Sequence, residues 1–172
     1  MASKLIHIRL SDTIPSSELN KFHCRDGMLN QFLRRKARKH LSEMLAITYL
    51  VYDLQHNLVG YYTLSSDTMP ATDIIQSRFQ NGKLYHAYPA IKIGRFAIDE
   101  KYKGVDLGTD IMDYIKLRFS TEPQNVASRF LLVDAYNIDK VIEFYKDKNG
   151  FEFWTKKDRY DDTRVLYYDL KS

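Results

Sequence analysis

The segment at residues 91–120 constrains the fold more than any other part of this chain, because its hydrophobic pattern changes period halfway along. Residues 91–98 are rich in branched and aromatic side chains, which predicts a strand. After a charged turn and two glycines, Gly104 and Gly108, apolar residues recur every three to four positions from Leu107, as on a helix with one buried face. This order of strand, glycine-bearing loop and helix leaves backbone N–H groups at the positive end of a helix, where a phosphate or pyrophosphate can bind.

The spacing of the loop residues excludes the two commonest nucleotide-binding motifs. A Walker loop reads GxxxxGK[ST] and a dinucleotide fingerprint reads GxGxxG, and neither run occurs in the chain. The loop instead reads KGVDLG over residues 103–108. It therefore predicts an anion site of another kind, whose identity depends on the segments before and after it.

The second half of the chain alternates strand and helix patterns. Residues 129–135 form a near-continuous apolar run, which suits a strand buried on both faces. Residues 139–149 have helical spacing, and the Asn-Gly pair at the end can close that helix in a left-handed turn. Residues 151–155 and 164–170 predict closing strands. A β-α-β-α-β order implies a parallel strand pair with helices outside it.

The first half predicts antiparallel strands and one long helix. Strands are expected at residues 5–10, 46–53 and 58–65, with a tight hairpin between the last two. Gly60 lies inside the last of these strands, which indicates a bulge or the close approach of another backbone. Helical spacing runs from Asp26, the expected N-cap, to Leu45.

Two features of the first half have open functional interpretations. The long helix carries a cluster of cations, namely Arg34, Arg35, Lys36, Arg38 and Lys39. This cluster is either a solvated face or an electrostatic contact with RNA or an acidic partner. Residues 66–89 form a long irregular segment with a helical turn expected over residues 74–79, and they either border a substrate entrance or make a surface insertion.

Composition limits the class of protein. At 172 residues, with 44% hydrophobic and 13% aromatic residues, the chain can form one domain with a proper core. A net charge of +4 is compatible with an anionic ligand or RNA. The single cysteine, Cys24, excludes an internal disulfide and a cysteine-based zinc site, and we expect it to be a packing residue. No run is long and apolar enough for a membrane span or a signal peptide, so a cytoplasmic location is expected.

Four segments, in matching order and spacing, resemble the GCN5-related N-acetyltransferase (GNAT) family. They are the strand IGRFAID at residues 93–99, the loop at residues 103–108, the strand at residues 130–135 with Asn137 after it, and a Phe-Tyr pair followed by Asn-Gly-Phe at residues 149–151. The family loop reads Arg/Gln-x-x-Gly-x-Gly/Ala, so Lys103 takes the basic position and Gly108 the last. The resemblance covers at least residues 89–153.

The first half of the chain resembles one branch of that family. The matching segments are Phe-His-Cys at residues 22–24, Asp26 with LNQFL at residues 29–33, VGYYTLS at residues 59–65, and residues 89–99. The branch contains toxins of toxin–antitoxin pairs, which acetylate the amino group of aminoacyl-tRNA, and many other acetyltransferases. The resemblance therefore makes RNA and an antitoxin-like protein candidate partners.

The resemblance implies acetyl-CoA as a cosubstrate, no metal, and a V-shaped gap beside the strand at residues 93–98. The residues that it places against the cofactor are Phe96, Ala97, Ile98, Lys103, Gly104, Val105, Asp106, Leu107, Gly108, Thr109 and Asn137. Backbone groups of the first three would pair with the pantetheine arm and hold the thioester oxygen. Asn137 would either contact that arm or cap the following helix. Tyr145 matches the family tyrosine near the thioester sulfur and would be the general acid, unless it is only a core aromatic residue.

Some positions depart from the family pattern or stay open. Asp106 stands where the family usually has glycine, so we expect CoA binding to be weakened but not abolished. Arg95 either faces the substrate or forms a buried ion pair. The general base cannot be identified from the sequence, and water can take this role. The candidates by chain position are Asp99, Glu100, Asp134 and His86.

We therefore expect a single domain over residues 1–172 of the α/β (α+β) class. Its GNAT-like core would be a mixed, mostly antiparallel sheet with splayed parallel strands at the centre and flanking helices. The expected function is an acetyl-CoA-dependent N-acetyltransferase that moves an acetyl group to a primary amine by direct attack. The alternatives are a toxin-type acetyltransferase of aminoacyl-tRNA and a catalytically weak CoA-binding or protein-interaction module. A homodimer is left open.

Overall fold

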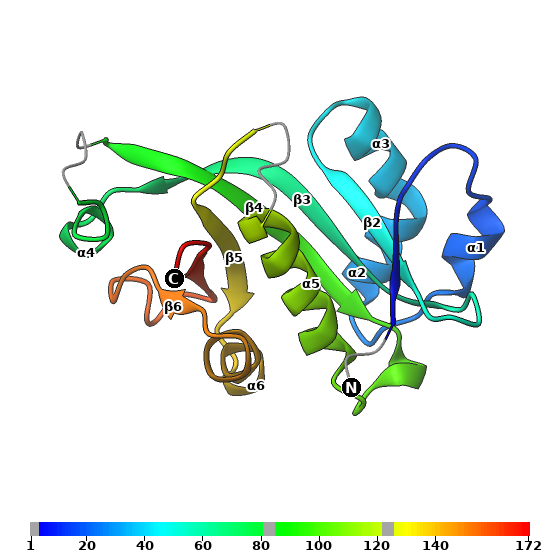
Figure 1. Ribbon diagram of the computed structural model, residues 1–172. Helices are drawn as coiled ribbons and strands as arrows, with labels where there is room; N and C mark the ends of the chain where they lie inside the picture. Colours follow the sequence, from blue (N-terminus) through cyan, green and yellow to red (C-terminus); the bar gives the residue numbers. More distant parts are fainter. Residues whose placement is uncertain (1–3, 81–84, 122–125) are drawn as a thin grey trace. The chain divides into compact units, whose positions relative to one another are not determined.

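A computed structural model describes residues 4–80, 85–121 and 126–172. Within these ranges the strands form a mixed sheet in the order β1-β2-β3-β4-β5-β7-β6 (Figure 1). The strands are β1 Ile6–Arg9, β2 Ile47–Tyr52, β3 Leu58–Pro70, β4 Ala87–Ile98, β5 Phe130–Tyr136, β6 Glu152–Phe153 and β7 Thr163–Asp169. β4 and β5 run parallel, whereas β1 with β2, β2 with β3, and β7 with both β5 and β6 are antiparallel. The predicted mixed, mostly antiparallel sheet is therefore confirmed.

The chain divides into two compact units. The first unit contains residues 1–65 and 93–115, and the second contains residues 66–92 and 116–172. Three elements contribute residues to both units, namely β3, β4 and the helix α5 (Leu107–Thr121).

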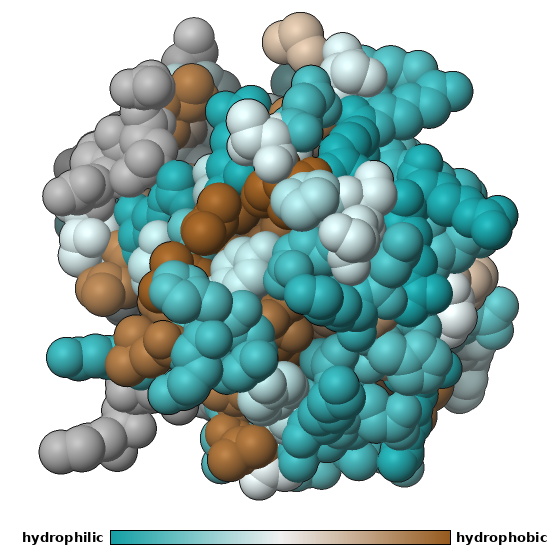
Figure 2. Space-filling view, turned by 90° about the vertical axis from the view of Figure 1, so that its right-hand side faces the viewer, coloured by the Kyte–Doolittle hydropathy of each residue, from teal (hydrophilic) through white to brown (hydrophobic). Residues whose placement is uncertain are grey.

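In the first unit, helices cover both faces of the strands. The helices α1 (Ser16–Lys21), α2 (Gly27–Gln31) and α3 (Ala37–Ser42) lie on one side of β2 (Figure 1). Their apolar side chains share a buried cluster with Leu50, Tyr61 and Ala97 of the strands. On the other side, Tyr114 of α5 stacks on His7 of β1, with 3.6 Å between ring centroids. Figure 2, which views the molecule from the right-hand side of Figure 1, shows hydrophilic residues over much of this face and a band of hydrophobic residues through its centre.

The long helix predicted from Asp26 to Leu45 begins as expected but is not a regular α-helix. The Asp26 carboxylate accepts hydrogen bonds from the N–H groups of Met28 and Leu29 at 2.8 and 3.3 Å, which confirms the predicted N-cap. A π-helical turn, η1 (Phe32–Lys36), then separates α2 from α3. Such a turn inserts a residue without breaking the apolar stripe, so hydrophobic spacing alone does not predict it.

Gly60 marks the close approach of backbones that its position in β3 predicts. A Cβ atom on this residue would lie 2.9 Å from the carbonyl oxygen of Ala97 in β4. The pairing of β2 with β3 also shifts register between Val51 and Tyr52. A larger residue at position 60 would therefore push β3 away from β4.

The prediction of an irregular segment over residues 66–89 is wrong at both ends. β3 continues to Pro70 and β4 already begins at Ala87, while the expected helical turn exists as α4 (Asp73–Gln76). The added strand residues are held by packing, because Met69 is fully buried in a cluster with Tyr88 and Phe130. Residues 81–84 of this segment lie outside the described ranges.

In the second unit, β5 is paired along its whole length with β7, and the helix predicted over residues 139–149 lies between β5 and β6 in the chain. This helix consists of α6 (Asp139–Glu143) followed by a π-helical turn, η3 (Phe144–Lys148). Gly150 has a φ of +70°, which confirms the predicted left-handed turn at the helix end. β6 is shorter than the predicted strand over residues 151–155. No helix among the described residues is long and apolar enough to cross a membrane.

Candidate active site

The loop between β4 and α5 has the backbone geometry of an anion site. Gly104 has a φ of +88° and Asp106 a φ of +46°, so the chain turns sharply before the helix begins at Leu107. The N–H groups of Thr109 and Asp110 bond to the Asp106 carbonyl, at 2.9 and 3.2 Å. Within the described part of the chain, the N–H groups of Val105, Leu107 and Gly108 donate to no acceptor. These donors point from a helix start, where negative charge is stabilised.

Asp106 combines a left-handed backbone with an exposed side chain. The positive φ explains why a glycine suits this position, and Asp is one of the few other residues that tolerate it. Its carboxylate forms no ion pair with any described residue, so neither Lys101 nor Lys103 neutralises it. A ligand phosphate in this loop would therefore meet a solvated negative charge.

The Phe-His-Cys segment at residues 22–24 holds the chain between β4 and this loop by hydrogen bonds. The sequence does not predict this role. The buried carboxylate of Asp99 accepts hydrogen bonds from the N–H groups of His23 and Lys101, at 2.8 and 3.0 Å. The Glu100 N–H donates to the His23 carbonyl at 2.8 Å, and the Glu100 carboxylate pairs with Arg25 at 2.9 Å. The hydrogen bond from Arg25 is the largest cause that lowers the pKa of Glu100. The end of β4 is thus fixed by the segment before α2.

Near Arg95, the side chains of β4 stop alternating regularly between the two faces of the sheet. A Cβ atom on Gly94 would contact the Thr63 hydroxyl at 3.2 Å, and Ala97 lies in the buried cluster that holds Tyr61. Thr63 and Tyr61 are two residues apart and so share a face of β3, whereas Gly94 and Ala97 are three residues apart. β4 therefore contains one extra residue, a bulge, between them.

The second half of β4 directs alternate backbone groups away from β3. The Asp99 N–H donates to the Val59 carbonyl at 2.8 Å, and the Ala97 carbonyl lies against Gly60, so both residues face β3. By alternation, the backbone groups of Phe96 and Ile98 point the other way. The parallel register of β4 with β5 ends at Lys92 with Leu132, whereas β4 continues to Ile98.

Tyr145 lies in η3 of the second unit, with its ring among aromatic side chains. It packs edge-to-face on Phe144 and Phe151, with centroid distances of 5.1 and 5.6 Å. Burial raises the pKa of the Tyr145 phenol above its ordinary value, so the hydroxyl is protonated at neutral pH. The hydroxyl has no hydrogen-bond partner among the described residues. The group is chemically able to donate a proton to a ligand.

Asn137 does not cap the helix that follows it, since Ile138 is the N-cap of α6. Its side-chain amide donates to the carbonyls of Arg159 and Asp161 at 3.1 and 3.0 Å, and so holds the turn before β7. The oxygen of the same side-chain amide is left to accept a hydrogen bond from a ligand. The predicted residues of β4 and of the loop thus lie in the first unit, and Asn137 and Tyr145 lie in the second.

Three of the candidate general bases, Asp99, Glu100 and Asp134, are bound to structural partners. Asp99 accepts two backbone hydrogen bonds and Glu100 pairs with Arg25. Asp134 pairs with Lys92, which also contacts Asp67 at 3.7 Å. Cys24 is buried, and burial raises the pKa of its thiol, which suits a packing residue better than a nucleophile. Among the described residues, no group of three His, Cys, Asp or Glu side chains could hold a metal ion.

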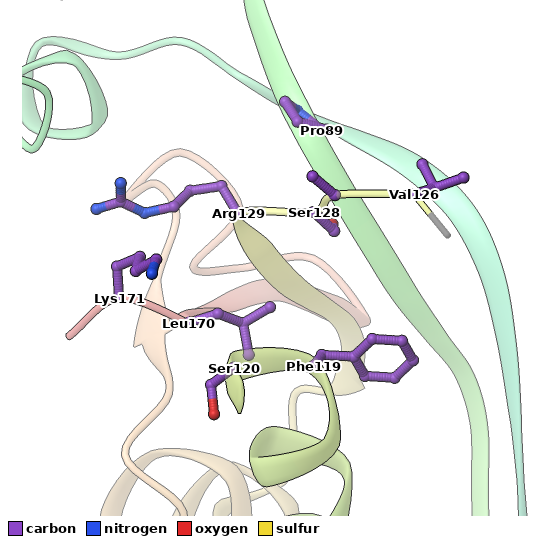
Figure 3. Close-up of a pocket in the computed structure, with 9 residues that line it drawn as sticks. Pro89, Phe119, Ser120, Val126, Ser128, Arg129, Leu170 and Lys171 are labelled. Atoms are coloured by element: carbon purple, nitrogen blue, oxygen red, sulfur yellow. The ribbon is translucent and has the colours of Figure 1, made fainter. Parts of the chain in front are cut away.

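A pocket of about 260 Å³, which no sequence pattern predicts, lies in the second unit (Figure 3). Phe119 and Ser120 come from the last turn of α5, Ser128 and Arg129 from the approach to β5, and Leu170 follows β7. The guanidinium of Arg129 is bound to the Asp169 carboxylate at 2.6 and 2.9 Å, so it is not available to a ligand. The pocket is therefore lined mainly by apolar groups, and none of its lining residues belongs to the loop before α5.

The fold is shared with solved structures of bacterial toxins. One is a Tyr-to-Phe variant of the toxin AtaT bound to the C-terminus of the antitoxin AtaR and acetyl-CoA, with a TM-score of 0.75 and 21% identity, over 98% of this chain and 95% of that chain. AtaT complexed with acetyl-methionyl-tRNAfMet gives a TM-score of 0.76 at 21% identity, over 98% and 96%. A Tyr-to-Phe variant of KacT gives 0.73 at 21% identity, over 98% and 96%.

At this level of identity, these similarities establish the fold. The mixed, mostly antiparallel sheet with flanking helices that the sequence predicts is the fold that these solved structures share. No family model matches the chain.

Proposed function

We propose that the chain is an acetyl-CoA-dependent N-acetyltransferase, acting as one domain over residues 1–172. The observation that carries this proposal is the loop between β4 and α5. There, at a helix start, the N–H groups of Val105, Leu107 and Gly108 donate to no acceptor among the described residues. A diphosphate is the ligand that such donors suit best. The similarity to AtaT, which has been solved with acetyl-CoA, supports this choice of ligand.

The loop and β4 divide the binding of the cofactor between them. Lys103, Gly104, Val105, Asp106, Leu107, Gly108 and Thr109 would surround the pyrophosphate. The outward backbone groups of Phe96 and Ile98 would pair with the pantetheine amides as an added strand does, and one N–H would hold the thioester oxygen. Ala97 would contribute through its packing, because its own carbonyl faces β3. The carbonyl oxygen of Asn137 is left for a contact with the same arm.

The reaction is direct attack of a neutral primary amine on the thioester carbonyl carbon. The C–N bond forms as the carbonyl oxygen takes negative charge, and collapse of this intermediate breaks the C–S bond. The thiolate of CoA leaves with the electron pair and takes a proton, while the amine nitrogen loses one to water. Tyr145 would donate the proton to sulfur. The raised pKa keeps the phenol protonated across the physiological range, so it serves as an acid and not as a base.

Aminoacyl-tRNA is the acceptor that a specific observation favours. AtaT has been solved with acetyl-methionyl-tRNAfMet. In this chain, the cations of η1 and α3 differ in their roles. Arg34 of η1 donates to the Phe22 carbonyl at 2.6 Å, and Arg38 of α3 donates to the Ile14 carbonyl. Arg35 and Lys36 are exposed and have no ion-pair partner among the described residues. They would be the residues of this turn that contact RNA.

An enzyme of this kind would work in the cytoplasm, with an antitoxin-like protein as a partner. AtaT is bound to the C-terminus of its antitoxin in one of the similar structures. The competing function is a CoA-binding module with little turnover, which the exposed carboxylate of Asp106 favours. A homodimer is compatible with either function.

The test is an acetyl-transfer screen with acetyl-CoA and three acceptor classes: small amines, peptides and charged tRNA. We expect release of CoA with charged tRNA, and we expect Tyr145→Phe to lower kcat about 10²- to 10⁴-fold, the usual contribution of a general acid. The variant should bind CoA normally, because the missing hydroxyl holds no hydrogen bond with any residue that the structure describes. CoA binding without transfer to any acceptor would favour the module, and equal rates for both proteins would remove Tyr145 from the mechanism.

A further inference from the structure

Arg95 occupies an unusual position for a cation. Its guanidinium lies 3.7 Å from the centroid of the Phe32 ring, stacked over the aromatic face. It makes no hydrogen bond or ion pair with any described residue, although the side chain is only partly exposed. From the sequence, Arg95 either faces the substrate or forms a buried ion pair. The structure shows no such ion pair among the described residues. The planar fork of N–H donors is thus held in place but chemically unused.

Two irregular elements create this arrangement. The bulge in β4 lies between Gly94 and Ala97, where such insertions re-aim a side chain. The π-helical turn η1 begins at Phe32, on the element packed over the same strand. π-Turns occur frequently at functional sites. The bulge in β4 and the π-helical turn η1 therefore meet where Arg95 contacts the ring of Phe32.

The aromatic ring under Arg95 is itself fixed. Phe32 is 3% exposed and lies parallel to Tyr61, with 6.4 Å between centroids, and edge-on to His40 at 5.0 Å. The Tyr61 hydroxyl donates to the Leu29 carbonyl at 2.8 Å, which ties β3 to α2. The guanidinium accordingly rests on a rigid surface and would lose little freedom when it binds a ligand.

The surrounding charges favour an anionic ligand. The acidic groups of this region are committed elsewhere, since Asp26 caps α2 and Asp99 accepts backbone hydrogen bonds. Exposed cations Arg35 and Lys36 lie on η1, the same turn that supplies Phe32. A guanidinium with free donors beside further cations matches the geometry and charge of a phosphate group.

We propose that Arg95 is the residue that holds a phosphate of the acceptor and thereby positions the acceptor amine. The inference rests on the proposed acetyl transfer, because Arg95 directly precedes Phe96, whose backbone is assigned to the thioester. It favours an RNA acceptor over a peptide, since the cations on η1 extend the binding surface for a polyanion. The acceptor phosphate would thus be bound by Arg95, and the exposed cations Arg35 and Lys36 would attract the polyanion to this surface.

The experiment compares Arg95→Gln and Arg95→Lys with the unaltered protein, using total charged tRNA and a panel of phosphate-free primary amines. We expect Arg95→Gln to raise KM for charged tRNA at least tenfold with kcat within threefold, and Arg95→Lys to restore only part of the loss because it lacks the planar fork. KM for acetyl-CoA and the rates with phosphate-free amines should be unchanged. Lys156→Gln, an exposed change of equal charge in the second unit, is the matched control and should leave every constant unchanged.

Three results would overturn the inference. The first is an unchanged KM for charged tRNA in Arg95→Gln, and the second is an equal loss with phosphate-free amines, which would indicate a structural role. The third is a loss confined to carboxylate-bearing peptides, which would assign Arg95 to a protein acceptor. Phe32→Leu, which removes the stacked ring, provides a second variant and should raise KM for tRNA less than Arg95→Gln does. If no variant, and not even the unaltered protein, binds acetyl-CoA in titration, the proposed function fails instead.

Discussion

At the scale of single residues, Asp106 decides how well the proposed cofactor loop works. Its φ of +46° shows that the loop requires a left-handed residue, and its exposed carboxylate lies beside the N–H donors of the helix start. A carboxylate about 5 Å from a phosphate charge opposes binding by about 1 kcal/mol per charge pair in a water-like medium. Because Asp106 is exposed, its repulsion of a phosphate should be near this energy. The repulsion between two buried charges would be several times larger.

We predict that Asp106→Gly increases the affinity for CoA about three- to tenfold, because it removes this charge and fits the positive φ. Isothermal titration with CoA measures the change. Asp106→Asn is the matched control, since Asn tolerates the same backbone but has no charge. A gain with both variants would assign the effect to charge, and a gain with glycine alone would assign it to the backbone. Unchanged affinity in both variants would contradict this interpretation of Asp106.

At the scale of elements, the strand ends of the second unit are held by ion pairs. Arg129, before β5, binds the buried carboxylate of Asp169 at the end of β7, and Arg78 approaches the same carboxylate at 3.3 Å. Burial by itself raises the pKa of Asp169, but hydrogen bonds from Arg129 and from the Lys171 N–H outweigh it, so the pKa lies below its ordinary value. The ionised carboxylate therefore stabilises the folded state.

We predict that Asp169→Asn lowers the free energy of unfolding by about 3 kcal/mol at pH 7, as expected when one partner of a buried pair is removed. A lowered pKa means that this stabilisation is complete above the unfolded-state pKa of about 4 and is lost as the pH falls through the folded-state value. The difference between the two proteins should thus shrink below about pH 4. Urea unfolding of both proteins at pH 7 and at pH 3 measures it. A difference that stays constant with pH would contradict the assigned role.

The elements also show what the sequence could predict. The Asp26 cap, the left-handed turn at Gly150 and the strand–loop–helix unit follow local rules, and the structure has all three. The π-helical turns η1 and η3 were not predictable, because one inserted residue leaves the apolar spacing almost intact. The extension of β3 to Pro70 is not predictable from the sequence, because residues 65–68 form a continuous polar run and only Met69 is buried in this part of the strand.

The candidate site was predictable only where it is continuous in the chain. The glycines and the change of hydrophobic period predict the loop over residues 103–108. The stack of Arg95 on Phe32 and the support of Asp99 by His23 join residues far apart in sequence, and no local pattern encodes them. Such contacts depend on tertiary packing, which a propensity does not contain.

At the scale of the whole molecule, both proposed functions require the folded chain to bind CoA. A ligand that binds only the folded state stabilises it by about 2.7 kcal/mol at a concentration 100 times its Kd. For a protein of this size, 1 kcal/mol corresponds to a shift in Tm of roughly 2–4 °C.

We therefore predict that saturating acetyl-CoA raises Tm by about 5–10 °C in a thermal unfolding scan. Tyr145→Phe should show the same shift, because the proton donor is not needed for binding. Replacing both loop glycines, Gly104→Val with Gly108→Val, should reduce the shift strongly, since a β-branched residue does not tolerate the φ of +88° at Gly104. If acetyl-CoA leaves Tm unchanged while charged tRNA raises it, the chain is an RNA-binding protein that keeps the fold of the toxins without their cofactor. That outcome would set aside acetyl transfer.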